Sequence, residues 1–259
     1  MSEEIAGRGD PRRALELMWG LSEGRKRGPR TKVALADLVA AAVRIADAEG
    51  IEAVSTRRVA EAVGMSPMSF YTHIPDKTVL LDLMLDAAAG PAEGETVDEP
   101  IAFDPTRWRD NVAMVARELR SFYLRHPWAL QIGTHRPVLG PNTMRSYDHF
   151  LTVFDGLGLS EVEMDLSATM VANYVHGAVR DVVRASMVKE QTGLSDDEWW
   201  YAVAPLLEQI DFSPYPVANR VGPVVGELYG LGDPDRAFEF GLERLLDGLE
   251  VLIRRKGEA

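Results

Sequence analysis

The sequence contains no cysteine, no long apolar run and no sustained alternation of apolar and polar residues. The first absence excludes disulfides, thiolate metal sites and cysteine nucleophiles. A membrane-spanning helix needs at least about eighteen apolar residues, and the N-terminus MSEEIAGRGDPRR lacks the apolar stretch of a secretory signal. We therefore expect a cytoplasmic protein without a membrane partner. The missing alternation leaves no predicted strand, so the predicted class is all-α.

Charge is unevenly distributed along the 259 residues, whose formal net charge is −12. Residues 25–77 hold nine basic and six acidic side chains, whereas residues 78–259 hold sixteen and twenty-nine. Because exposed charges are screened beyond roughly 8–10 Å, the local excess decides which partner is attracted. The basic run is either a solvated tail or a flexible arm that meets DNA phosphates or a minor groove; it consists of Arg25, Lys26, Arg27, Arg30 and Lys32.

Residues 55–77 predict two short helices joined by a tight turn. Ser55 and Ser66 have the short oxygen side chains that cap helix N-termini, and Pro67 suits a first helical position. Gly64 suits the left-handed residue that ends the first of the two helices. A longer amphipathic helix over 33–49, closed by Gly50, precedes them. Three helices in this order are typical of a unit that places its last helix in the major groove of DNA.

The two short helices face each other through apolar side chains at Val59, Ala60, Val63 and Phe70. The remaining side chains are basic, small and polar, or large and exposed, and they are left for solvent or a partner: Arg57, Arg58, Ser66, Met68, Ser69, Tyr71, Thr72 and His73. A helix that offers such side chains from its first turn is suited to touch another molecule.

Helical spacing of apolar residues continues along the chain, with 46% hydrophobic residues to form a core. It predicts a short amphipathic segment at 11–21 and helices at about 77–89, 105–125, 141–156, 160–191, 195–209 and 234–255. Residues 90–105 read as a linker. Residues 211–233 contain three prolines and four glycines and are predicted to form a long loop.

The chain resembles the TetR family of one-component transcriptional repressors. The resemblance is strongest over about residues 31–89, in TRRVAEAVGMSPMSFYTHIPDKTVLLDLM, and GMSPMSFYTHIPDK is its most diagnostic part. Segments such as WRDNVAMVARELRSFYLRHPWAL and GPNTMRSYDHF are similar to the tetracycline-repressor-type C-terminal domain. The implied organisation is an N-terminal extension with a basic arm (1–30), a three-helix helix-turn-helix DNA-binding domain (31–77), and a connecting helix with a larger helical ligand-binding and dimerisation domain (78–259).

By position, the resemblance implies phosphate contacts from Thr56, Arg57 and Lys77. It implies a recognition surface made of Pro67, Met68, Ser69, Tyr71, Thr72 and His73, beside which Ser66 and the arm residue Arg30 are counted as DNA-binding. The predicted recognition helix lacks Arg, Asn and Gln, the side chains that read guanine or adenine bidentately. Thymine-methyl contacts, hydroxyl hydrogen bonds and DNA shape are left to supply specificity. Tyr71 either contacts DNA or packs on the helix pair.

Two further predictions concern the C-terminal part. The stripes of helices 160–191 and 234–255 suit a homodimeric four-helix interface, unless they pack only within one subunit. A largely apolar effector pocket with a few polar groups is predicted from Phe122, Trp128, Met144, Tyr147, Phe150, Phe154, Met170, Asn173, Tyr174 and His176, although a plain core also explains most of them. The helix at 77–89 is the natural lever between that pocket and DNA.

The function that follows is a ligand-responsive repressor, without cofactor or catalytic residues, that binds a palindromic double-stranded operator as a homodimer. A small-molecule effector would release it. The alternatives are an activator or an architectural DNA-binding protein of the same fold. A metal-dependent helical enzyme would need a ligand set from His126, His135, His149 and His176, but these lack the HExxH spacing of a helical metal pair. We therefore predict neither a metal site nor an enzyme.

Overall fold

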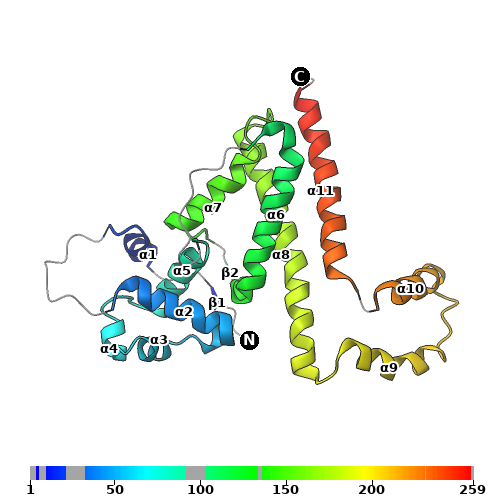
Figure 1. The fold of residues 1–259 in the computed structure, drawn as a ribbon, viewed down its shortest axis with the longest axis horizontal. Helices are drawn as coiled ribbons and strands as arrows, with labels where there is room; N and C mark the ends of the chain where they lie inside the picture. Colours follow the sequence, from blue (N-terminus) through cyan, green and yellow to red (C-terminus); the bar gives the residue numbers. More distant parts are fainter. Residues whose placement is uncertain are drawn as a thin grey trace. The chain divides into compact units, whose positions relative to one another are not determined.

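The protein is described by a computed structural model that covers residues 4–5, 10–21, 33–91, 103–133, 136–230 and 232–257. These residues are mostly helical, which confirms the all-α class (Figure 1). Strands β1 (Glu4–Ile5) and β2 (Ile132–Gly133) form one two-residue parallel pair, with Glu4 opposite Ile132. A pair this short needs no alternating pattern, so it was not predictable from periodicity. The chain divides into two compact units, residues 1–169 and 170–258.

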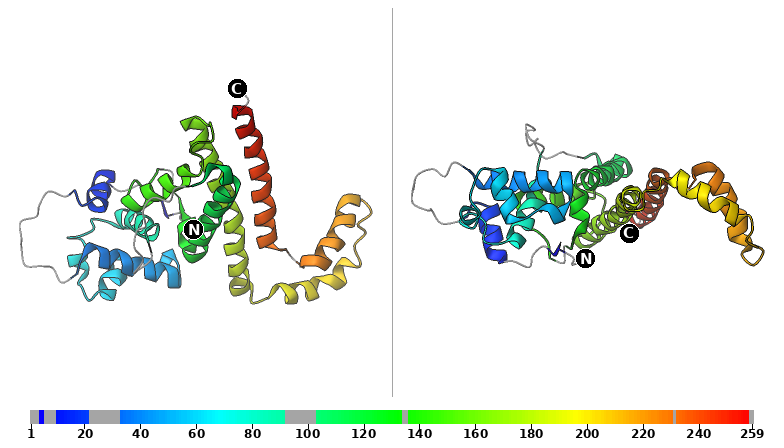
Figure 2. Two further views of the ribbon diagram at one scale, coloured as in Figure 1. Left: turned by 45° about the horizontal axis from the view of Figure 1, so that its top comes forward. Right: turned by 90° about the horizontal axis from the view of Figure 1, so that it is seen from below.

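The first unit holds the N-terminal helices and the start of α8. Its elements are α1 (Pro11–Met18), α2 (Leu35–Glu49), η1 (Ile51–Ala53), α3 (Thr56–Ala62), α4 (Pro67–Phe70), α5 (Lys77–Ala88), η2 (Pro105–Arg107), α6 (Trp108–Arg125), η3 (Pro127–Gln131) and α7 (Pro141–Thr152). The predicted helices at 33–49, 77–89, 105–125 and 141–156 are all present, with ends shifted by a few residues. Figure 2 shows α2, α3 and α4 grouped together in this unit.

Helix α5 is the centre of the first unit. Every residue from Val79 to Asp86 is buried, because α5 packs against α1, α2 and α7. Leu80 and Met84 are fully buried, and they belong to the same core cluster as Leu38 and Ala42 of α2. Helix α5, the predicted lever, therefore contacts both α2, which precedes it in the chain, and α7, which follows it.

A second connection between α2 and the later helices runs through Asp47. Its Oδ1 accepts a hydrogen bond from Trp128 Nε1 at 2.6 Å and lies 2.7 Å from His126 Nδ1. Trp128 is buried, and His126 is largely so. These polar contacts satisfy an indole N–H that burial would otherwise leave without a partner, and they fix η3 against the end of α2.

The second unit contains the rest of α8 (Glu161–Thr192) with α9 (Asp196–Leu207), α10 (Pro216–Tyr229) and α11 (Pro234–Gly257). Tyr174 of α8 stacks on Phe238 of α11, and its Oη donates to the Phe238 carbonyl at 2.6 Å. A Cβ at Gly241 would lie 2.3 Å from Tyr174 Oη, so glycine is needed for this close packing. The predicted helices at 160–191, 195–209 and 234–255 are present. Ser195 caps α9 by accepting a hydrogen bond from Glu198 N.

The prediction of a long loop at 211–233 is wrong, because α10 occupies Pro216–Tyr229. Two of the three prolines lie within this helix, and one of them stands where a helix favours proline. Pro216 stands at the first helical position, where its missing N–H has no intrahelical partner to lose. Pro223 lies inside α10. Gly230, at φ +63°, ends the helix in the left-handed region.

None of the described helices combines the length and the apolar character that a membrane span requires.

Candidate nucleic-acid interface

The turn between α3 and α4 has the predicted capping geometry. Ser55 Oγ accepts a hydrogen bond from Arg58 N at 3.2 Å, and Ser66 Oγ accepts one from Ser69 N at 3.2 Å. Gly64 has φ +69°, and Met65 N returns to the Ala60 carbonyl at 2.9 Å. These bonds pair backbone groups that a helix end leaves unsatisfied. The predicted caps and the left-handed glycine are therefore confirmed.

Helix α4 has only four residues, but its two faces differ sharply in exposure to solvent. Phe70 is fully buried beside Val59 and Ala60 of α3, whereas 78% of Met68 is exposed. After Phe70 the backbone continues as hydrogen-bonded turns, with Thr72 N donating to Ser69 O and His73 N to Phe70 O. Burial of one face fixes the orientation of the other. The face that contains Pro67, Met68 and Tyr71 is thereby presented to solvent.

Tyr71 combines the two roles that the sequence left open. Its ring meets Phe70 edge-on, with centroids 5.7 Å apart, and its Oη lies 3.2 Å from Thr56 Oγ1 at the start of α3. Yet 49% of the residue remains exposed. Packing on one side and a hydroxyl pair on the other restrict the rotamer of an exposed aromatic side chain. Such a side chain is pre-organised for contact with a partner.

The hydroxyls of the predicted recognition surface are held by local hydrogen bonds. Ser66 Oγ lies 2.9 Å from Ser69 Oγ, and Thr72 Oγ1 donates to the Ser69 carbonyl at 2.6 Å. Because a hydroxyl has one proton but two acceptor lone pairs, these groups can still accept hydrogen bonds. Adenine N6 and cytosine N4 donate hydrogen bonds in the major groove, so a base edge can complete this set.

Both arginines of α3 are paired with carboxylates. Arg57 Nε lies 2.8 Å from Glu61 Oε1, and this hydrogen bond raises the pKa of the Arg57 guanidinium. Arg58 pairs with Glu49 of α2. These pairs are exposed, so water and salt weaken them and a phosphate can compete for the guanidinium groups.

His73 and Lys77 follow α4 in the sequence. Lys77 is the first residue of α5, and Asp76 caps that helix by accepting from Val79 N at 2.9 Å. A cation and a helix N-terminus both attract a phosphate. His73 is half-buried in the turn before α5. The predicted arm residue Arg30 lies outside the described residues.

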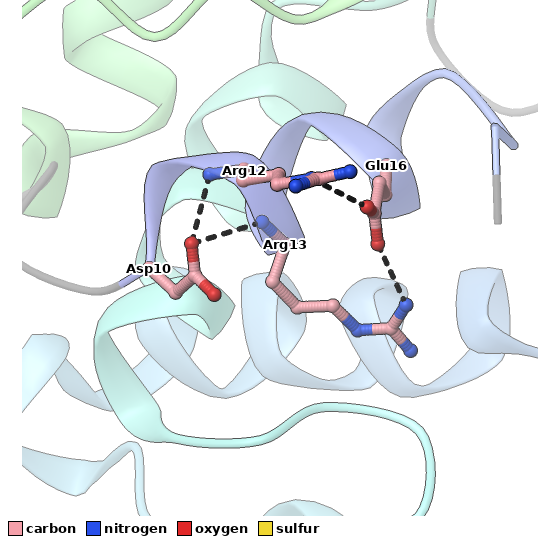
Figure 3. A network of polar contacts seen from close by, with 4 residues as sticks. All are labelled: Asp10, Arg12, Arg13 and Glu16. Atoms are coloured by element: carbon pink, nitrogen blue, oxygen red, sulfur yellow. Dashed lines mark hydrogen bonds and ion pairs between the residues drawn. The ribbon is translucent and has the colours of Figure 1, made fainter.

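Helix α1 adds a feature that sequence reasoning did not assign. Asp10 caps the helix by accepting from Arg12 N and Arg13 N, and both arginine side chains pair with Glu16 (Figure 3). A cleft of about 1110 Å³ lies beside α1, and Leu35 at the start of α2 and Thr72 and His73 after α4 are among its lining residues. The capping signal Asp10–Pro11 was readable, but contact of α1 with this region depends on long-range packing.

Six of the predicted ligand-binding residues lie in the first unit. Trp128 and Phe154 are buried, and Phe122 contacts the His126 ring with centroids 5.3 Å apart. Phe150 is half-buried, and Met144 is partly exposed. Tyr147 Oη donates to Asp165 Oδ1 at 2.7 Å, which raises the pKa of Tyr147. Trp128 is thus committed to Asp47, whereas Met144 and Tyr147 keep exposed surface.

The other four predicted ligand-binding residues lie on α8 in the second unit. Met170 and Asn173 are exposed, and Tyr174 is held by α11 as described above. His176 is half-buried. Burial and then the nearby charge of Arg180 lower the pKa of His176. At neutral pH its ring is therefore neutral, with one nitrogen able to donate and the other to accept a hydrogen bond.

The histidines proposed for a metal site have separate partners where the structure describes them. His126 faces Asp47, and His149 Nε2 lies 3.1 Å from Glu118 Oε2. Within the described part of the chain, no group of three or more histidine, aspartate or glutamate side chains is placed to hold a metal ion. His135 lies outside that part.

Two family models match the chain. The model described as "Bacterial regulatory proteins, tetR family" matches residues 38–84, and "Tetracyclin repressor-like, C-terminal domain" matches residues 102–253. The first match covers α3, α4 and the capped turn between them, together with most of α2 and α5. The second begins before α6 and ends within α11.

Among curated relatives, the HTH-type transcriptional repressor DrrR1 of Streptomyces coeruleorubidus is 41% identical over 261 residues, which covers 100% of this chain and 93% of the relative. The tetracycline repressor protein class A from transposon 1721 of Escherichia coli is 28% identical, with 85% and 91% covered. A solved structure of the Streptomyces coelicolor TetR family protein ActR in complex with actinorhodin aligns with a TM-score of 0.67 and 27% identity, covering 85% of this chain and 96% of ActR.

Proposed function

We propose that this ligand-responsive DNA-binding repressor, which belongs to the TetR family of transcriptional regulators, holds a palindromic operator as a homodimer until a largely apolar small molecule releases it. The observation that carries the DNA-binding part is the two-faced helix α4. Phe70 on one face is fully buried, while Met68 on the other face and Tyr71 just after the helix are exposed. The start of the helix is capped by Ser66.

Operator recognition is assigned to the exposed side of α3 and α4. Thr56 and Lys77 stand at helix N-termini, where a phosphate is favoured, and they flank the recognition surface in the sequence. Met68 and Pro67 supply apolar contacts of the kind that thymine methyl groups accept. Ser69 and Thr72 supply hydroxyls. We assign Arg57 to a phosphate as well, reached by giving up its pairing with Glu61.

Dimerisation is assigned to α8 and α11. Both helices bury one stripe and expose another within the subunit: Val171 and Val175 are fully buried, but 60% of Leu166 is exposed. On α11, Leu242 is fully buried, whereas 65% of Phe240 is exposed. Large exposed apolar side chains on otherwise packed helices suit a second copy of the chain. Two copies would place paired α4 helices about 34–36 Å apart to read successive major-groove faces.

Effector binding is assigned to the first unit, where Met144 and Tyr147 are the predicted ligand-binding residues that keep exposed surface. The complex of ActR with actinorhodin makes actinorhodin the first probe to titrate into the protein–operator complex. Release requires that the effector favour a conformation with the wrong spacing of recognition helices. Equal operator affinity with and without a saturating amount of a small molecule that the protein binds would contradict release by that ligand.

The test of the DNA-binding function is selection of bound duplexes from a random pool by the purified protein. We expect an inverted repeat with half-site centres about 10 bp apart, or a multiple of that distance. Binding that ignores sequence but falls steeply with salt would instead favour the architectural alternative. An activator would select a motif too, but deletion of its gene would lower transcription from the neighbouring promoter rather than raise it.

Lys77→Ala is expected to weaken binding to all DNA sequences by a similar factor, because the lysine is assigned to a phosphate rather than a base. The slope of log affinity against log salt concentration should fall by about one unit for each phosphate that is no longer neutralised. Fluorescence anisotropy with the selected operator and with a scrambled duplex measures both effects. Lys256→Ala, in the last turn of α11, is the matched control. A change in motif preference rather than in overall affinity would contradict this assignment.

A further inference from the structure

Helix α7 begins without a capping side chain of its own. Its N-cap residue is Gly140, and its first helical residue is Pro141. The backbone N–H groups of the second and third helical residues, Asn142 and Thr143, are the ones that an N-cap side chain normally accepts. Here they are satisfied from a different helix.

Asp86 of α5 supplies the missing acceptor. Its Oδ1 accepts from Asn142 N at 3.0 Å and from Thr143 N at 2.9 Å, and Thr143 Oγ1 lies 3.0 Å from the same oxygen. Asn142 Nδ2 approaches Oδ2 at 3.3 Å. Only 5% of Asp86 is exposed. Burial of a carboxylate is energetically unfavourable unless its oxygens accept hydrogen bonds, and the N–H groups of α7 supply these bonds. The negative charge is also attracted to the helix N-terminus.

Gly140 makes the contact possible. Its φ is −85°, which any residue adopts, so backbone conformation does not require glycine. A Cβ at this position would lie 2.1 Å from Asp86 Oδ1 and 2.7 Å from Met18 Sδ of α1. Glycine is therefore needed for space. Helix α1 closes the same junction from its other side, where Trp19 Nε1 donates to the Leu139 carbonyl at 2.8 Å.

We propose that Asp86 is the positioning residue that couples the N-terminus of α7 to α5, so that the two move together when the protein changes between DNA-binding and released states. This inference rests on the proposed function. Separating the helices would leave a buried carboxylate and two helix N–H groups without partners, which opposes independent movement. Leu81 and Met84 of α5 are buried in the core, so substituting them would mainly reduce stability.

The coupling is tested by hydrogen exchange on full-length protein, with the selected operator duplex as the probe. Linkage is reciprocal, so DNA binding at α4 must change the protection of α7 if Asp86 couples them. In the wild type we expect a saturating operator to slow exchange of the Asn142 and Thr143 amides by about fivefold or more. In Asp86→Asn, which loses the charge but keeps the size, this operator-dependent ratio should fall close to one while operator binding is retained.

Gly140→Ala provides a second variant, because it disturbs the same contact from α7. Asp148→Asn, an exposed change on α7, is the matched control and should keep the wild-type ratio. A purely structural Asp86 would raise exchange by the same factor with and without DNA, so an unchanged ratio in the variants would overturn the proposal. Wild-type protein that binds operator without any change in α7 exchange would overturn it as well. Failure of the wild type to bind any duplex is a different result, which would remove the proposed function and this inference together.

Discussion

Replacing Tyr71 with alanine is expected to abolish selection of a DNA motif while leaving the protein folded. Tyr71 follows directly after α4 and is 49% exposed, so removal of its side chain creates no large cavity. One mismatched base pair costs a specific complex about 1–3 kcal/mol, or roughly ten- to hundredfold in affinity, and loss of a side chain that contacts a base is expected to cost a similar amount. The alanine also removes the hydroxyl that meets Thr56 Oγ1 at 3.2 Å. Operator affinity measured by anisotropy, with circular dichroism as the folding check, gives the result.

Tyr71→Phe separates the two parts of this side chain. It keeps the ring that packs on Phe70 but loses the hydroxyl, so an intermediate affinity is expected if both parts contribute. Tyr201→Ala is the matched control, since Tyr201 is an exposed tyrosine on α9. Unchanged motif selection by Tyr71→Ala would show that Tyr71 has a packing role alone, and would remove this residue from the recognition surface.

Phe70→Ala should have the opposite profile, with a large loss of stability. Phe70 is fully buried, and truncation of a buried phenylalanine costs about 3–5 kcal/mol through lost burial and the cavity that remains. Typical domains are stable by only about 5–15 kcal/mol, so the DNA-binding helices would be close to unfolding. Urea denaturation followed by circular dichroism measures the change in the free energy of unfolding.

Met68→Ala is the control for Phe70, because the two residues lie on opposite faces of the same short helix. With 78% of Met68 exposed, its truncation should change the free energy of unfolding by no more than about 0.5 kcal/mol. If Phe70→Ala had an effect of that small size, the two-faced description of α4 would be wrong. Together, Phe70 and Tyr71 separate stability from recognition at neighbouring positions.

Local features were predictable from the sequence, because their physical causes lie within a few residues. Ser55, Ser66 and Asp76 cap helices whose starts they immediately precede, and Gly64 adopts the left-handed conformation that ends α3. The error at α10 has a local cause too. Counting prolines as helix breakers overlooked that Pro216 stands at a first helical position, where proline is favourable.

The rest could not be predicted, because the partners are far apart in the chain. Asp47 accepts from Trp128, 81 residues later, and Asp86 caps a helix that begins more than fifty residues after it. Only a missing capping side chain at Gly140 hinted that the start of α7 needed an outside acceptor. Which aromatic residues face an effector is likewise a matter of tertiary packing. Trp128 shows this, since its polar group is already taken by Asp47.

The carboxylates beside Arg57 and Arg58 have a consequence for how the protein searches a genome. Each guanidinium group already has a negative neighbour, Glu61 or Glu49, and gains little by exchanging it for a random phosphate. Such internal neutralisation is expected to shorten the time that the protein spends on unrelated sequence, where backbone charge is the main attraction. At the operator, the base contacts proposed for the recognition surface would hold the protein long enough for Arg57 to exchange Glu61 for a phosphate. Fewer protein molecules would then be held at the roughly 10⁶ or more non-specific sites that compete with the operator, so a larger fraction would occupy the operator.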